Sequence, residues 1–518
     1  MYNTKIKFGV FMNNTKKFAL NAVILTATSL ITSCASMSFT VFITGKIGAA
    51  GVGLYQLIMT VYRLAVTFAT GGIGLASTRL VSEEMALGNP KGAGRAVKNC
   101  LFYALTLSVC TGTALFFSSE FIASTWLGDM RTMKSLRSLA LSLPALSASS
   151  VLCGYFTAVR RVFKSSAVLL LEQYVKITLS VYFLGYFSGD GLENACCALV
   201  LSGTAAELFS CLVMCAVYLF DRRRHNSRDK DRTQSDGLCR RMMSIAVPVA
   251  LTSYLRSGLT SVEQMMIPWG LKKYGHSKNA ALAEYGIIGG MVMPVIMFPA
   301  VFISAFSGLL ITEISACRAL GNKNKINRIF SYFFRLTVLF SVAVAGVLCG
   351  FGGDIAMALY HSRRAAKFIQ LLAPLVCVMY LDSVTDSMLK GLNLQQNHMC
   401  YNIIDSAVSI LLTVTLLPTL GINGYIIVIT VSELLNFILS FRKLVKTIGF
   451  QVHFFTNVAK PIISIVLSVL IMRLFSQFIR PLTLPLFIAA ALAIYLCLLW
   501  MLGCVTKDDT VFVKNKFL

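Results

Sequence analysis

Several ionisable side chains stand inside long apolar stretches of this sequence, where they could handle a charged ligand or an ion. Arg63 lies among apolar residues, and Arg256 precedes Glu263 by seven residues, which places the two on one face of a helix. Asp382 and Asp386 are spaced i, i+4 and also share a helix face. Charges in apolar segments are costly, so these five residues are functional candidates.

The residue types indicate two kinds of chemistry. A permanently charged arginine binds phosphate through two parallel hydrogen bonds, so Arg63 and Arg256, with Glu263 nearby, suit an anionic, hydroxyl-rich ligand. Two carboxylates on one face, Asp382 and Asp386, can share a proton or bind a cation. The alternatives are structural: an arginine that pairs with Glu263 to hold helices together, and aspartates that are hydrated or meet Lys390.

Other membrane charges have simpler interpretations. Glu172 and Lys176 are spaced i, i+4, which predicts an intrahelical salt bridge. Glu207 and Glu433 stand late in two apolar stretches, and we expect a structural role for both.

The elements that must position these residues are membrane helices. Of 518 residues 56% are apolar and only 13% charged, with a mean hydropathy of +0.72. A bilayer core needs about 20 apolar residues of helix, and open sheets are excluded there because their edge groups stay unpaired. The sequence predicts an all-α polytopic membrane protein with about fourteen spans, at 17–44, 52–76, 97–118, 136–158, 166–187, 194–219, 242–269, 284–308, 329–350, 366–388, 401–420, 424–441, 459–479 and 483–504.

The net charge of +25 orients these spans. With the N-terminus placed in the cytoplasm, loop cations fall on the cytoplasmic side in a ratio of roughly three to one, as the positive-inside rule requires. Both termini are then cytoplasmic, and the charge excess indicates no nucleic-acid partner. The basic segment 221–241 is interpreted as a topology signal that contacts anionic lipids.

The chain repeats itself. Residues 80–83 (LVSE) and 86–89 (ALGN) recur as 310–313 (LITE) and 319–322 (ALGN), and Tyr55 falls on Tyr285. Spans 1–6 are thus repeated as spans 7–12. Six is even, so the repeats are parallel, an arrangement used by transporters with a substrate path between the halves. We expect an N-lobe at 1–220, a linker at 221–241, a C-lobe at 242–445, and the last two spans with a cytoplasmic tail at 446–518.

This pattern resembles the multidrug/oligosaccharidyl-lipid/polysaccharide (MOP) exporter superfamily, with its MATE-like two-lobed fold. Within that superfamily, 47–56 (IGAAGVGLYQ), 72–77 (GIGLAS) and 389–396 (LKGLNLQQ) are similar to the polysaccharide exporters of the stage V sporulation protein B branch. The resemblance covers about the whole chain. It implies a flippase of lipid-linked oligosaccharide or peptidoglycan precursors, and a role in spore or cell envelope formation.

One departure concerns the arginines. Related lipid II flippases carry cavity arginines on the first, second and eighth spans, and only Arg63 matches by position here. The predicted first span has no basic residue after Lys17, and the eighth has none. Arg256 on the seventh span is then the candidate that substitutes for them.

The function expected from the sequence is alternating-access transport in the cytoplasmic membrane, not catalysis. The alternatives are a MATE-type cation-coupled drug antiporter, against which spans 13 and 14 argue, and a membrane-embedded polysaccharide polymerase, whose large catalytic loop is missing from the sequence. The fifteen cysteines form no metal-binding pattern, and neither a metal nor a cofactor is expected. Expected partners are a polyprenyl-linked glycan, membrane lipids and envelope-synthesis enzymes, and a monomer is expected.

Overall fold

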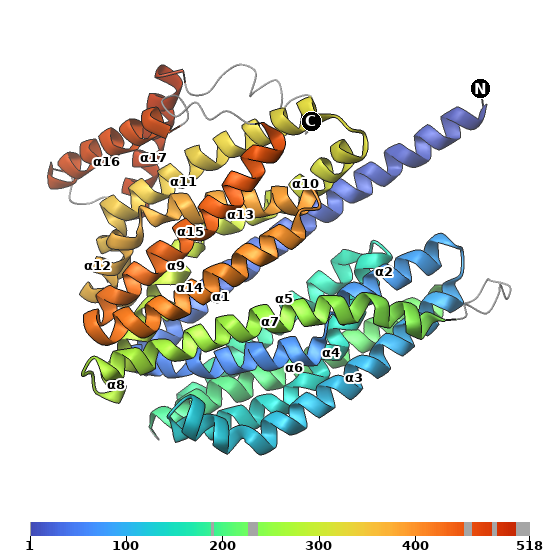
Figure 1. Ribbon diagram of the computed structural model, residues 1–518, viewed down its shortest axis with the longest axis horizontal. Coiled ribbons are helices and arrows are strands. Elements are labelled where there is room, and N and C mark those ends of the chain that lie inside the picture. The colour runs from blue at the N-terminus through green and yellow to red at the C-terminus, as the bar shows by residue number, and fades with distance from the viewer. Residues whose placement is uncertain (1, 188–190, 226–236, 450–457, 479–483, 504–518) are drawn as a thin grey trace. The chain divides into compact units, whose positions relative to one another are not determined.

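The computed structural model describes residues 2–187, 191–225, 237–449, 458–478 and 484–503 (Figure 1). Over these residues the chain folds into helices and contains no strand. The helices of the first half are α1 (Tyr2–Thr70), α2 (Ile73–Ala86), α3 (Pro90–Phe121), α4 (Met133–Ala158), α5 (Val162–Phe187), α6 (Leu192–His225) and α7 (Leu238–Lys273). Those of the second half are α8 (Lys278–Gly286), α9 (Met293–Met297), α10 (Ala300–Ala319), α11 (Lys323–Tyr360), α12 (Arg363–Leu372), α13 (Leu375–Gly391), α14 (Gln395–Leu420), α15 (Ile422–Ile448), α16 (Lys460–Phe478) and α17 (Leu484–Met501).

The prediction of an all-α polytopic membrane protein is confirmed. Ten described helical segments are long and apolar enough to cross a membrane, and the pair α12–α13, bent by 56°, adds an eleventh. The predicted first and second spans fall within one of the ten segments, Thr26–Ala86, which is broken at Gly48, where the backbone is not helical, and again between α1 and α2. The seventh and thirteenth lie on α7 and α16, which are helical but not among the ten. The number fourteen therefore stays a prediction.

Glycine and proline residues account for the breaks in two of the predicted span regions. Helix α1 bends at Gly48 (φ 67°) and ends before Gly71 and Gly72, both of which have positive φ. The predicted eighth span is divided into α8, a π-helical turn (Ile287–Val292), α9 and α10, with Pro299 at the last break. Proline removes a backbone donor, so a long membrane helix cannot run straight through this segment.

The chain packs as two compact units. Unit 1 comprises Met1–Trp269 and Ser277–Gly286, and unit 2 comprises Gly270–His276 and Ile287–Leu518. Most of α7 thus packs with the first half, so the contact boundary differs from the linker predicted at 221–241, of which 226–236 lie outside the described residues. The lobes predicted from the repeat remain a prediction about which helices move together.

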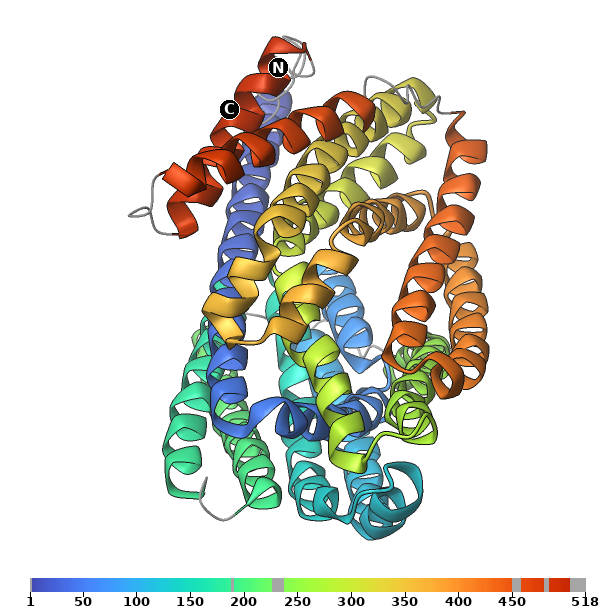
Figure 2. The same cartoon turned by 90° about the vertical axis from the view of Figure 1, so that its left-hand side faces the viewer.

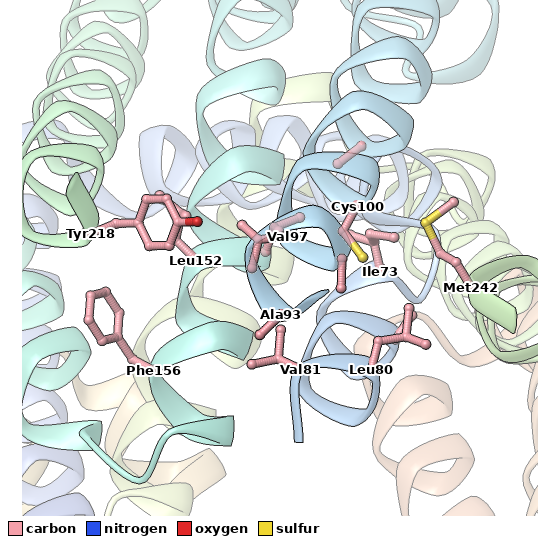
Figure 3. Packing of buried hydrophobic residues seen from close by; sticks show 14 of the residues in the cluster. Ile73, Leu80, Val81, Ala93, Val97, Cys100, Leu152, Phe156, Tyr218 and Met242 are labelled. Atoms are coloured by element: carbon pink, nitrogen blue, oxygen red, sulfur yellow. The ribbon is translucent and has the colours of Figure 1, made fainter. Parts of the chain in front are cut away.

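Small residues let the helices of unit 1 approach closely, as membrane helices require when water supplies no hydrophobic driving force between them. Figure 3 shows one cluster in which a small residue packs among larger ones, with Ala93 from α3 beside Ile73 from α2, Phe156 from α4, Tyr218 from α6 and Met242 from α7. This cluster anchors the start of α7.

The packing of α1 on α8 is even closer. A Cβ atom at Gly53 would lie 1.9 Å from the carbonyl oxygen of Leu282, and one at Gly286 would lie 2.1 Å from that of Ala49. No side chain fits at either position, so the two helix backbones touch there.

A loop carboxylate also ties α8 into unit 1. Asp129, which is buried, contacts Lys278 at 3.2 Å and Arg131 at 2.7 Å, and the Arg131 side chain donates to Asn279 at 3.1 Å. Burial opposes ionisation of Asp129, but hydrogen bonds from Arg131 outweigh it and hold the pKa of this carboxyl below its usual range.

In unit 2, α16 and α17 lie side by side and pack on α11 (Figures 1 and 2). Gly346 and Gly350 of α11 receive Ile465 and Val469 of α16, and the Tyr495 hydroxyl donates to the carbonyl oxygen of Leu339 at 2.9 Å. The two C-terminal helices are therefore an attachment to the ninth predicted span.

The repeat is visible in the local structure. Gly88 (φ 69°) and Gly321 (φ 67°) each end a helix in the left-handed conformation, and the next residue caps the following helix. The Asn89 side chain accepts from the Gly92 amide at 2.9 Å, and the Asn322 side chain accepts from the Lys325 amide at 3.0 Å. The same four-residue motif thus makes the same helix–turn–helix corner in both units.

Candidate functional site

Arg63 lies on a polar seam between α1 and α7 in unit 1. Its Nη2 donates to the Gln264 side-chain oxygen at 2.9 Å and to the Thr60 hydroxyl at 3.2 Å, and Thr60 also donates to Gln264 at 2.7 Å. The arginine side chain is exposed and forms no ion pair with any residue that the structure describes. Its partners are neutral, so its positive charge is not balanced locally.

The same seam continues toward the end of α1. The Thr67 hydroxyl donates to the Ser257 hydroxyl at 3.1 Å, and the rings of Phe68 and Tyr254 lie 4.5 Å apart. These contacts set the rotation of α7 about its axis, and hence the direction of the residues between them.

Arg256 stands between Tyr254 and Ser257 on this stretch of α7. Its side chain is exposed, and within the described part of the chain it makes neither a hydrogen bond nor an ion pair. Glu263, two turns further along α7, is half-buried and lies with Arg63 in the electrostatic environment of Tyr285.

Asp382 and Asp386 of α13 belong to an acidic cluster in unit 2. Asp382 is buried and accepts from the Asn436 side chain of α15 at 2.9 Å, while its other oxygen has no hydrogen-bond partner among the described residues. Asp386 contacts Nδ1 of the buried His398 of α14 at 2.8 Å, in a geometry outside that of a hydrogen bond.

Two more carboxylates surround this pair. Asp405 of α14 accepts from the Ser432 hydroxyl of α15 at 2.7 Å, and Asp386, Glu433 and Asp405 all act electrostatically on Asp382. Several charged carboxylates are costly in an apolar environment, and binding of a proton, a cation or a basic side chain lowers that cost. Among the described residues no group of His, Cys, Asp and Glu has the geometry of a metal site.

The corresponding residues of unit 1 are arranged differently. Glu207 of α6 accepts from the Tyr62 hydroxyl at 2.5 Å, and Tyr62 also contacts the Ser142 hydroxyl at 2.7 Å. The predicted salt bridge between Glu172 and Lys176 is wrong, since the described residues show no ion pair between them. Lys176 instead faces Tyr55 and Glu207 as well as Glu172, because the helices around α5 supply these partners.

A pocket of about 430 Å³ opens beside this cluster. Glu172 and Glu207 line it together with hydroxyl groups, and the buried hydroxyls of Ser149 and Ser210 have no hydrogen-bond partner among the described residues. Carboxyl and hydroxyl groups thus share this pocket with apolar side chains.

The sequence analysis did not identify His398, Asn436 or Tyr62 as members of a site. Each is a single polar residue in or beside an apolar stretch, without a motif. Their partners lie 12, 54 and 145 positions away in the chain, so only the tertiary structure brings them together.

Comparison with known proteins agrees with this architecture. The sequence profile of the polysaccharide biosynthesis protein family matches residues 18–275. Stage V sporulation protein B of Bacillus subtilis (strain 168) is 26% identical over 513 residues, which cover 95% of this chain and 96% of that protein. Lipid II flippase MurJ of the same organism is 23% identical over 474 residues, 84% of each chain.

The fold is also found among solved structures. An inward-facing multidrug resistance MATE family transporter of the MOP superfamily aligns with a TM-score of 0.65 at 14% identity, over 83% of this chain and 98% of that one. An outward-facing transporter of the same description aligns with a TM-score of 0.58. The family profile and the relatives that span nearly the whole chain show that this chain is similar to polysaccharide exporters, and its fold is that of the transporters of the MOP superfamily.

Proposed function

We propose that this protein is a flippase that moves a lipid-linked oligosaccharide or peptidoglycan precursor across the cytoplasmic membrane by alternating access, in spore or cell envelope formation. The similarity to stage V sporulation protein B and to lipid II flippase MurJ supports the substrate class. Two parallel six-helix repeats provide two bodies that can rock against each other around a substrate path. The protein acts as a monomer, with both termini in the cytoplasm, and receives its substrate from envelope-synthesis enzymes.

The observation that carries the proposal is the unbalanced charge of Arg63 and Arg256. An arginine within a membrane span is costly unless its charge is paired or reaches water, and neither residue stabilises its unit through an ion pair with a described residue. Both side chains are exposed, and Arg256 makes no hydrogen bond with a described residue. A diphosphate that links a glycan to a polyprenyl chain is the anion that two such guanidinium groups suit.

Glu263 complements the arginines. It is half-buried on the α7 stretch that includes Gln264, the partner of Arg63. A carboxylate accepts hydrogen bonds and repels phosphate, so it would bind sugar hydroxyls while the arginines bind the diphosphate. The glycan and the diphosphate would therefore bind at different positions along α7.

Asp382 and Asp386 form the coupling site of the proposed cycle. Binding of a proton or a cation to this cluster removes the penalty of buried negative charge, and its release restores that penalty. An ion gradient can therefore bias unit 2 between two packings, which is what drives alternating access.

The test is a translocation assay in vesicles that contain the purified full-length protein and a defined polyprenyl-diphosphate-linked glycan. Arg63→Ala and Arg256→Ala are each expected to lower translocation by roughly 10- to 150-fold, because each removes a charge-assisted hydrogen bond worth about 1.5–3 kcal/mol. The matched control is Arg240→Ala, an exposed arginine at the start of the same helix and outside its predicted span. It should translocate normally.

Normal translocation by both arginine variants, at wild-type levels in the membrane, would contradict the substrate site. Export of a soluble organic cation instead of the lipid-linked glycan would favour the MATE-type antiporter. The unbalanced arginines argue against that alternative, since they repel cations.

A further inference from the structure

We propose that a pocket at the cytoplasmic end of unit 2 binds the phosphate headgroup of an anionic phospholipid from the inner leaflet. The pocket encloses about 280 Å³. Three helix ends meet there, namely the α10–α11 corner, the α13–α14 corner and the end of α15, and the lining residues are Arg318, Gly321, Lys323, Ile326, Leu392, Leu394, Thr447 and Ile448.

The corners that form the pocket are firmly held. The Ser315 hydroxyl of α10 donates to the carbonyl oxygen of Gly391 at 3.1 Å, and a Cβ atom at Gly391 would lie 2.9 Å from Ile314. Helices α10 and α13 therefore touch just above the pocket. Asn393 (φ 58°) and Gly449 (φ 74°) end α13 and α15 in the left-handed conformation, which turns both chain segments around its rim.

The chemistry of the lining is that of an amphiphile site. Ile326 and Leu392 are buried, and with Leu394 and Ile448 they give an apolar floor. Arg318 and Lys323 stand exposed at the rim, and neither forms an ion pair with a described residue. The ligand that matches is an anion attached to an apolar body.

The two rim cations, Arg318 and Lys323, do not stabilise the fold. Lys323 is the first residue of α11, where the positive end of the helix dipole disfavours a cation by about 0.3–1 kcal/mol. Lys325, also in this first turn, is balanced by Glu313 at 3.3 Å, but Lys323 has no such partner among the described residues. An anion bound at this corner would interact favourably with the dipole and with both rim cations.

The first repeat shows that the corner does not require these cations. When Leu87-Gly88-Asn89 is matched with Leu320-Gly321-Asn322, Met85 stands at the position of Arg318 and Pro90 at that of Lys323. In unit 1 the corner is instead closed internally, because the buried Glu84 pairs with Arg241 at 3.2 Å and accepts from Asn89 at 3.1 Å. The two rim cations are a property of the second repeat alone.

The predicted topology decides between sources of the anion. All three helix ends lie on the cytoplasmic side, where the inner leaflet presents anionic headgroups that attract Lys and Arg by about 1 kcal/mol each. The volume is below the roughly 300–1,000 Å³ of pockets for drug-sized ligands, so it fits a headgroup and the first tail carbons, not an oligosaccharide. The inference does not depend on the substrate of the transporter.

The test is lipid retention by the full-length protein in nanodiscs, measured by native mass spectrometry with phosphatidylglycerol and phosphatidylcholine of identical tails. The wild type should retain phosphatidylglycerol preferentially, and the double variant Arg318→Gln/Lys323→Gln should lose that preference by roughly tenfold or more. Arg318→Lys/Lys323→Arg should keep it. So should Arg95→Gln/Lys98→Gln, which removes two exposed cations of α3 beyond the equivalent corner of unit 1.

Three results would overturn the proposal. One is unchanged preference in the Arg318→Gln/Lys323→Gln variant, and another is an equal loss in the Arg95→Gln/Lys98→Gln control. The third is displacement of the lipid by glycerol phosphate, which would make this a site for a free phosphate. If the charge variant does not fold, Leu394→Trp fills the pocket without changing its charge and should lower phosphatidylglycerol retention by itself.

Discussion

The two repeats carry acids at matching places in their membrane helices but balance them differently. Glu207 in 206–208 (AEL) matches Glu433 in 432–434 (SEL), and Glu172 of the fifth predicted span lies at roughly the place of Asp405 in the eleventh. Four residues after Glu172 stands Lys176, whereas four residues after Asp405 stands the buried Ser409. Unit 1 thus contains its own counter-charge, and unit 2 has a serine in that place.

Unit 2 adds acids where unit 1 adds hydroxyl groups. Glu207 is held by the Tyr62 hydroxyl at 2.5 Å, whereas in unit 2 Asp382 and Asp386 join the cluster with one histidine beside them. Neighbouring carboxyl groups disfavour one another's ionisation, so a cluster with more of them binds a proton or a cation more readily. On the proposed function, we therefore expect unit 2 to be the half that responds to an ion gradient.

The largest effect on this difference between the units is expected when Asp386, the acid that contacts His398, is neutralised. Asp386→Asn removes one ionisable carboxyl group from the cluster. Gradient-driven translocation should therefore fall by roughly 5- to 150-fold, which is the usual strength of coupling between two sites. Translocation rates are measured in vesicles with proton and sodium gradients imposed one at a time.

The matched control in unit 1 is Glu172→Gln, which should leave the dependence on the gradient unchanged. Gradient dependence that survives in Asp386→Asn and disappears in Glu172→Gln would reverse the assignment of the two units.

A smaller effect tests whether Lys176 balances the negative charge of the acids in unit 1. Lys176→Met keeps the length of the side chain and removes its charge, so Glu172 and Glu207 lose their nearby cation. The free energy of unfolding should fall by roughly 1–3 kcal/mol, the cost of leaving a buried polar group unsatisfied. Thermal unfolding of the purified protein measures this, with Lys176→Arg as the variant that preserves charge. Equal stability of Lys176→Met and the wild type would mean that the lysine does not balance the acids.

The helices and the repeat could be predicted from the sequence because both depend on residues that are close together along the chain. Apolar runs of about 20 residues define a span, and the Leu-Gly-Asn corner needs only a glycine with positive φ and an asparagine cap. The breaks at Gly71–Gly72 and Pro299 follow from the same local chemistry. The division of the chain between the two units could not be read in this way, because α7 is attached to unit 1 by individual side chains such as Gln264 and Tyr254.

The candidate site was predictable only as a set of costly residues. A lone arginine such as Arg256 is conspicuous in an apolar stretch, but its lack of a partner depends on helix rotation and on rotamers. The failure of Glu172 and Lys176 to pair has the same origin, since neighbours on α1 and α6 surround the lysine. Spacing along one helix says which side chains can meet, and the other helices decide which do.

The smallest expected effect separates what the repeats share from what they do not. Asn89→Ala and Asn322→Ala each remove a helix cap, which costs about 1 kcal/mol. Asn89→Ala should lower the free energy of unfolding by about 1 kcal/mol more, because the buried Glu84 also loses a hydrogen-bond donor.

The variants Asn89→Asp and Asn322→Asp sharpen the test. An aspartate caps a helix equally well, but at position 89 it faces Glu84, and at position 322 it has Lys323 beside it. Thermal unfolding should therefore show Asn322→Asp as neutral and Asn89→Asp as destabilising. Equal unfolding of the two aspartate variants would contradict the view that the first corner is closed by its own buried carboxylate while the second is left open to an external anion.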